Sequence, residues 1–177
     1  PRLLGLDSSL WRALDPSQQW RWIEWFVLQQ ASPYSVLPLD AVQGCPPAVE
    51  DLANTFCAHS GPNCFATTLA AITPDRASAQ LISQLWLTAD AFLHGLAQRG
   101  YRDQQTSTIE PADLTDAVVV WADQAGEPRH ACYVITAGIA LNKDSQTWYA
   151  PRQLVDLAEI IGVWAEDGYR LSVYRRH

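Results

Sequence analysis

The fold of this chain is decided by residues 130–142, which read HACYVITAGIALN. Residues 130–136 and 138–142 are two mostly apolar runs, and the short link between them is at Ala137 and Gly138. Two such runs with a short, glycine-containing link are typical of a β-hairpin. The pattern therefore predicts two antiparallel strands, and the hairpin returns Asn142 toward His130.

The rest of the second half of the chain is also predicted to be rich in strands. Residues 118–122 form a continuous apolar run, which the turn-forming residues 124–128 separate from the hairpin. Further strands are expected at 148–149 and 169–174. A helix is expected over about 151–161, between these two strands.

The first half is predicted to be helical, with an irregular stretch over 32–62. Residues 8–31 are expected to contain a helix, with Asp15 as N-cap and Pro16 at its first position. This helix is apolar almost all round and rich in Trp, so we expect it to be largely buried or to pack on another domain or protein partner. Short helices are expected at 49–56 and within 74–99. Helices followed by strands predict an α+β fold.

A helix is also predicted to begin at Cys64. Asn63 is a favoured N-cap residue, Phe65 and Leu69 fall on one helical face, and Pro74 ends the pattern. Cys64 would then lie in the first turn, where unpaired backbone N–H groups and the helix dipole favour negative charge. We therefore expect the thiol pKa to be lowered, as nucleophilic catalysis by cysteine requires.

Cys64, His130 and Asn142 have the residue types of a cysteine-based catalytic site, in a suitable chain order. The imidazole would share a proton with the thiol, and the amide would orient the ring. Asp144 and Gln146 stay open as alternatives for the third residue, because a strand end is uncertain by a few positions. The alternative interpretation of Cys64 is a buried structural cysteine.

The composition excludes several classes of function. With 177 residues and 48% hydrophobic side chains, the chain is expected to form a single domain with its own core. A net charge of −7 argues against a nucleic-acid partner, and no apolar run is long enough to span a membrane. Because the chain starts at Pro1 and contains no Met, we expect it to be a processed chain or a part of a longer product.

The remaining cysteines leave two further hypotheses open. Cys45 and Cys57 are candidates for a disulfide across a loop, which would suit an extracytoplasmic or secreted protein. Cys57, His59, Cys64 and Cys45 are alternatively candidates for a structural zinc site, although the C-x-H-x₄-C spacing is irregular. Cys132, on the strand after His130, is expected to fill the core.

Three segments of the sequence resemble the papain-like superfamily and, within it, the NlpC/P60 class of bacterial cysteine peptidases. Asn63-Cys64-Phe65 resembles the start of the family's cysteine-bearing helix. Residues 112–121 resemble the family's strand before the histidine, although Thr115 and Asp116 interrupt the apolar run, and 130–142 resemble its histidine strand and the next strand. The match covers about residues 60–150, so the resemblance implies a papain-like domain with an N-terminal extension (1–59) and a catalytic core (60–177).

The resemblance implies hydrolysis of a peptide or other amide bond through a thioester on Cys64, without metal or cofactor. His130 would protonate the leaving amine and activate water, Asn142 would hold the ring, and a bacterial cell-wall peptide would be the usual substrate. Two alternatives are an inactive papain-like binding module and an acyl or peptidyl transferase with the same site.

The chain departs from the papain pattern at the oxyanion position, because Ala58 stands where a glutamine is expected. The candidate replacements are Asn54, His59, Ser60 and Asn63, together with the backbone N–H of Cys64.

Overall fold

The computed structural model describes residues 12–30, 33–42, 44–104, 110–165 and 168–176. Its centre is a six-stranded antiparallel sheet with the strand order β1-β6-β2-β3-β4-β5. The strands are β1 (Tyr101–Asp103), β2 (Ala117–Ala122), β3 (Pro128–Thr136), β4 (Ile139–Lys143), β5 (Arg152–Asp156) and β6 (Arg170–Arg176). The helices are α2 (Pro16–Gln30), α3 (Pro47–Leu52), α4 (Cys64–Ala71), α5 (Arg76–Ile82), α6 (Ala89–Gln98) and α7 (Leu157–Ala165), with 3₁₀ turns at Leu39–Val42 and Pro111–Asp113.

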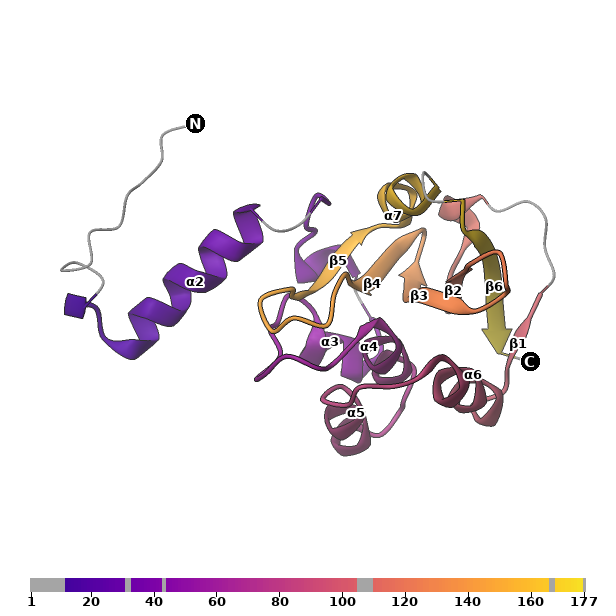
Figure 1. Ribbon diagram of the computed structural model, residues 1–177, viewed down its shortest axis with the longest axis horizontal. Helices are drawn as coiled ribbons and strands as arrows, with labels where there is room; N and C mark the ends of the chain where they lie inside the picture. Colours follow the sequence, from indigo (N-terminus) through magenta and orange to yellow (C-terminus); the bar gives the residue numbers. More distant parts are fainter. Residues whose placement is uncertain (1–11, 31–32, 43, 105–109, 166–167, 177) are drawn as a thin grey trace.

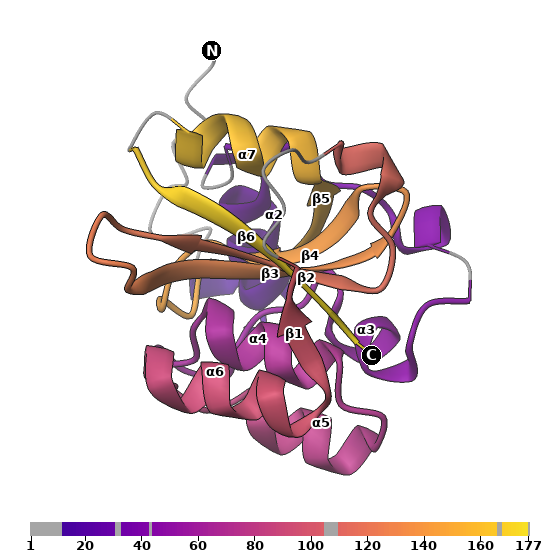
Figure 2. The same ribbon diagram turned by 90° about the vertical axis from the view of Figure 1, so that its right-hand side faces the viewer.

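The helices lie on both faces of the sheet (Figures 1 and 2). Helices α4, α5 and α6 lie on one side of the sheet, and α7 lies on the other. Side chains alternate along β3 accordingly: Ala131, Tyr133 and Ile135 join the core under α4, whereas Cys132 and Val134 join the core under α7. The prediction of an α+β fold, with N-terminal helices on an antiparallel sheet, is confirmed.

The predicted hairpin is formed by β3 and β4. Ala137 and Gly138 turn the chain with φ of 42° and 76°, the left-handed conformation that a tight hairpin turn requires. Gly138 is also required for space, because a Cβ atom there would lie 2.8 Å from the carbonyl oxygen of Pro111. The register is therefore fixed at the turn, and β4 runs back along β3.

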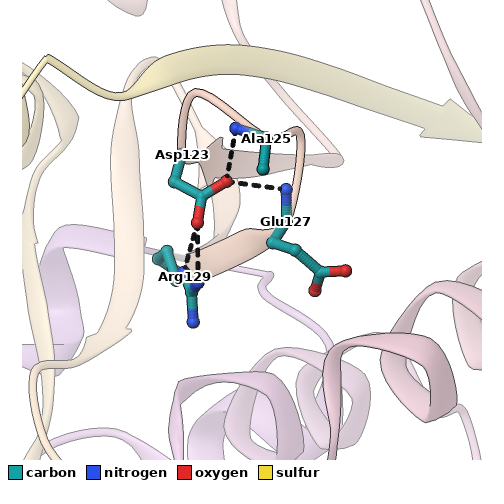
Figure 3. A network of polar contacts seen from close by, with 4 residues as sticks. All are labelled: Asp123, Ala125, Glu127 and Arg129. Carbon is teal, nitrogen blue, oxygen red and sulfur yellow. Dashed lines mark hydrogen bonds and ion pairs between the residues drawn. The ribbon is translucent and has the colours of Figure 1, made fainter.

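The turn between β2 and β3 is closed by the side chain of Asp123 (Figure 3). Its Oδ1 accepts hydrogen bonds from the backbone N–H groups of Ala125 (2.9 Å) and Glu127 (3.0 Å), and its Oδ2 accepts one from Arg129 Nε (2.8 Å). Arg129 directly precedes His130, so this network fixes the beginning of β3 where the predicted catalytic imidazole lies.

Two predicted elements near the C-terminus are wrong. Residues 148–149 lie outside the strands, and residues 152–156, expected in a helix, form β5 along β4. The pairing partner offered by β4 outweighs the local helical pattern of this segment, and the helix begins only at Leu157, after Asp156 accepts a hydrogen bond from the N–H of Ala158 (2.8 Å). Strand β1 was not predicted, since three residues carry no periodic signal.

Helix α2 begins as predicted, and its described side chains are not buried within this chain, so of the two expectations only packing on another domain or protein partner stays a prediction. Asp15 accepts hydrogen bonds from the N–H groups of Ser17 and Gln18, while Gln18 accepts one from Asp15, which is a reciprocal cap. Residues 16–23 are exposed or partly exposed, and α2 projects from the rest of the molecule (Figure 1). Trp20 stacks on Trp148 at 5.3 Å between ring centroids and remains 40% exposed.

Candidate functional site

Helix α4 begins at Cys64 because Asn63 caps it, as the sequence predicts. The Oδ1 atom of Asn63 accepts a hydrogen bond from the N–H of Ala66 (3.1 Å), and its Nδ2 donates to the carbonyl oxygen of Leu87 (2.7 Å). Asn63 is 5% exposed. Its side chain therefore ties the first turn of α4 to the segment before α6.

We predict that Asn63→Ala lowers the free energy of unfolding by about 2 kcal/mol, because the cap and the bond to Leu87 are both lost. Asn63→Asp keeps the capping oxygen and loses only the donor to Leu87, so its loss should be smaller. Urea unfolding of the two variants and the wild type measures both losses in the free energy of unfolding. Equal losses for the two variants would contradict the role given to the capping oxygen.

The thiol of Cys64 lies against the backbone of β3. Backbone N–H groups of Ala131, Phe65 and Cys64 act on the sulfur and favour the thiolate, as does the ammonium of Lys143. Burial of the sulfur outweighs them and raises the thiol pKa to about 11. The expectation of a lowered pKa is therefore wrong: the first turn of α4 is present, but the effect of burial on the thiolate is larger, although Cys64 as a whole remains partly exposed.

The imidazole of His130 is held by Asn142, as the hairpin predicts. Asn142 Oδ1 accepts a hydrogen bond from His130 Nε2 at 2.8 Å, and both residues are 1% exposed. Because Nε2 carries the proton in this bond, Nδ1 is the ring nitrogen that can accept one. Burial lowers the pKa of His130 to about 4, although Asn142 and the charge of Asp144 act in the opposite direction. The ring is therefore neutral at pH 7.

The imidazole lies on the face of the sheet that α7 covers. It stacks on Trp164 of α7 with ring centroids 4.4 Å apart, and Trp121 packs on it at 5.3 Å. Helix α4 packs on the other face. Beyond the Tyr133–Leu141 pair, β3 and β4 no longer pair, and this is where the thiol meets the N–H of Ala131. The contacts of the described residues include no hydrogen bond between thiol and imidazole.

Tyr34 and Trp164 complete a polar cluster around Asn142 that the sequence analysis missed. The hydroxyl of Tyr34 donates to Asp144 Oδ1 at 2.8 Å, and burial together with that carboxylate raises the pKa of Tyr34. The side chains of Asn142 and Trp164 also act on this hydroxyl. Asp144, an alternative third residue, therefore bonds Tyr34, and Asn142 is the residue that contacts His130. No sequence signal linked Tyr34 to residues more than a hundred positions away.

Lys143 organises the loop beside the thiol. Its ammonium is buried and donates to the carbonyl oxygens of Ser145 (2.6 Å), Thr147 (3.0 Å) and Ala150 (2.7 Å). The same loop joins the segment before Cys64, because the N–H of Gly61 donates to the carbonyl oxygen of Gln146 (2.7 Å). Gln146, the other alternative third residue, thus contacts the segment before Cys64 through its backbone, whereas the side chain that contacts His130 is that of Asn142.

The predicted oxyanion residues are engaged elsewhere. Both polar atoms of Asn63 serve the cap and Leu87. Asn54 bonds the carbonyl of Leu37 and the N–H of Leu154, Ser60 accepts from the N–H of Trp148, and His59 Nδ1 contacts its neighbour's carbonyl oxygen. The hydrogen-bond donors that act on the sulfur are backbone N–H groups, among them that of Ala131, which sequence reasoning missed. The oxyanion role expected for the backbone N–H of Cys64 stays a prediction.

The other cysteines form neither of the sites considered from the sequence. Cys45 and Cys57 are both free, so the suggested disulfide is absent and the argument for an extracytoplasmic setting loses its basis. Among the described residues, no group of three or more His, Cys, Asp or Glu side chains is placed to hold a metal ion. Cys132 is fully buried in the core under α7, as predicted.

We predict a pH-dependent loss of stability that originates at His130. Its pKa falls from 6.5 to about 4 on folding, so the unfolded chain binds the extra proton between these values and stability falls as pH is lowered through this window. The effect amounts to up to about 3 kcal/mol. Unfolding free energies at pH 7 and pH 4.5 should differ by more in the wild type than in His130→Gln. If the free energy of unfolding changed equally with pH in the wild type and in His130→Gln, the result would contradict a buried, neutral imidazole.

Comparison of the chain with protein-family models, with curated proteins and with solved structures finds no significant match in any of the three. None of the helices within the described ranges is long and apolar enough to cross a membrane. The three comparisons thus assign no family to the chain.

Proposed function

We propose that this chain is a papain-like hydrolase that cleaves amide bonds through a thioester on Cys64. The observation that carries the proposal is the thiol at the first turn of α4, acted on by the backbone N–H of Ala131, directly after His130 in β3, whose Nε2 is held by Asn142. A nucleophile at a helix start beside a base that a third residue orients is the arrangement that covalent catalysis uses.

The reaction begins with a neutral pair. At pH 7 the thiol retains its proton, since its pKa is about 11, and the imidazole is unprotonated, since its pKa is about 4. The proton of Sγ passes to Nδ1 of His130 as the sulfur attacks the carbonyl carbon. Because the thiol and the imidazole lie on opposite faces of β3 in the free protein, this step requires that substrate binding bring them within hydrogen-bond distance. Catalytic hydrogen bonds are often long in free enzymes and shorten in the complex.

The imidazolium then gives its proton to the leaving amine, and a thioester with Cys64 remains. Water attacks this thioester with His130 as the base, which releases the acid and restores the thiol. The backbone N–H groups of Cys64 and Ala131 are the donors available to a developing oxyanion. An amine or hydroxyl acceptor in place of water would make the same site a transferase.

The test is product analysis with defined peptides. The purified chain is incubated with ordinary peptides and with cell-wall peptides that contain a γ-linked D-Glu to diamino acid bond, and new amino termini are identified by mass spectrometry. We expect cleavage by the wild type, none by Cys64→Ala, and unchanged cleavage by Cys132→Ala. Cleavage that persists in Cys64→Ala would reject the proposal.

A second candidate is a catalytically inactive papain-like module that binds a partner. It is favoured by the raised thiol pKa and by the lack of a thiol–imidazole hydrogen bond among the described contacts. In that case a peptide ligand would bind equally to the wild type and Cys64→Ala, and no thioester would form with any substrate.

A further inference from the structure

A cavity of about 480 Å³ lies at the C-terminal end of α4, the opposite end of that helix from Cys64. It is lined by residues 44–47, by residues 71–74, by Thr115 and Asp116 just before β2, and by residues of β3 and β6. Its volume falls within the range of about 300–1,000 Å³ that small-molecule sites occupy. The walls combine prolines and other apolar residues with a few polar groups, which is the usual lining of such a site.

One polar group of the cavity is the carboxylate of Asp116. Its Oδ1 atom accepts hydrogen bonds from the hydroxyls of Tyr101 (2.8 Å) and Tyr133 (3.0 Å), which arrive from two different strands and are buried. Asp116 itself is exposed and has a φ of 46°, a conformation that is uncommon for residues other than glycine. The carboxylate is therefore fixed in place, and its Oδ2 has no hydrogen bond to any described residue.

The second charged group of the cavity is Arg176. Its guanidinium lies over the ring of Tyr101, 5.3 Å from the centroid, and its charge acts on both tyrosines that bond Asp116. Among the described residues of the lining, only Asp116 and Arg176 are charged, and none of the ion pairs within this part of the chain joins them. The cavity therefore presents one carboxylate and one guanidinium that do not neutralise each other by direct contact.

We propose that this cavity binds a small zwitterion, an α-amino acid or a dipeptide with an apolar side chain. Asp116 receives the ammonium group, Arg176 the carboxylate group, and the apolar side chain packs on Pro46, Ile72 and Ile135. Ionic hydrogen bonds at both ends of the ligand discriminate against molecules that carry only one charge. The site does not depend on the chemistry proposed for Cys64.

The experiment is a calorimetric titration of the full chain with L-leucine, Ala-Leu, N-acetyl-leucine and leucinamide. We expect a zwitterion to bind at least about tenfold more tightly than the last two ligands, each of which lacks one charge. Comparison of leucine with Ala-Leu then distinguishes an amino-acid site from a dipeptide site.

The matched variants are Asp116→Asn and Arg176→Gln, with Asp113→Asn and Arg175→Gln as controls outside the cavity. Asparagine keeps an acceptor for both tyrosines and tolerates the left-handed conformation, so Asp116→Asn should fold. Each cavity variant should weaken zwitterion binding at least about tenfold, and the controls should not change it. No binding by the folded wild type, equal binding of all four ligands, or full binding by Asp116→Asn would each overturn the proposal.

Discussion

Replacing His130 with alanine is expected to reduce kcat/KM for an amide substrate by about a thousandfold or more, because in the proposed reaction the thiol then loses the group that accepts its proton. Burial holds the thiol pKa near 11, so little thiolate exists at pH 7 without the imidazole. Asn142→Ala should cost less, about ten- to a hundredfold, because it leaves the base in place but frees the ring whose Nε2 it holds at 2.8 Å.

The matched control is His94→Ala. His94 is exposed and contacts Gln98 within α6, so its loss should leave kcat/KM unchanged. Steady-state kinetics of the three variants on one cleaved peptide make the comparison. A His130→Ala enzyme within tenfold of the wild type, with cleavage still dependent on Cys64, would assign the base to another residue.

Replacing Trp121 with alanine is expected to produce the largest loss of stability, about 3–5 kcal/mol. Among the residues whose burial the structure describes, Trp121 is the largest fully buried side chain, and it packs on both His130 (5.3 Å) and Trp164 (6.3 Å). The cavity that remains would also let water reach the imidazole, so the pKa of His130 should rise from about 4 toward its ordinary value of 6.5.

Trp86→Ala is the control for this change, because Trp86 is 56% exposed and its loss should cost well under 1 kcal/mol. Urea unfolding measures the stabilities, and NMR titration of the His130 ring measures its pKa. Similar losses in the two variants, or a His130 pKa that does not move, would contradict the packing described around the imidazole.

The sequence predicted the parts of the site that local chemistry determines. Asn63, a favoured N-cap residue, predicts the beginning of α4. The short link at Ala137 and Gly138 predicts the hairpin that brings Asn142 to His130. The raised thiol pKa could not be predicted from the sequence, because the dipole and N–H groups of a helix start are local, whereas the burial that outweighs them depends on the packing of α4 against strands that are distant in the sequence.

Long-range contacts account for the remaining errors. Tyr34 reaches Asp144 across the fold, and β5 forms because β4 offers it an edge to pair with, although residues 152–156 carry helical signals. The side of the sheet on which His130 lies could not be predicted either. Because β3 is buried on both faces, its sequence has no alternation of apolar and polar residues that would show which side chains lie under α7.

The most direct test of the central claim is the rate at which p-nitrophenyl acetate acetylates each cysteine as a function of pH, mapped by mass spectrometry. If His130 takes the proton of Cys64, Cys64 should be acetylated fastest, at a rate that is nearly constant from about pH 5 to 9, because the imidazole pKa is about 4 and the thiol pKa about 11. His130→Ala should remove this advantage. A Cys64 rate no greater than that of partly exposed Cys45, rising about tenfold per pH unit with or without His130, would contradict the account.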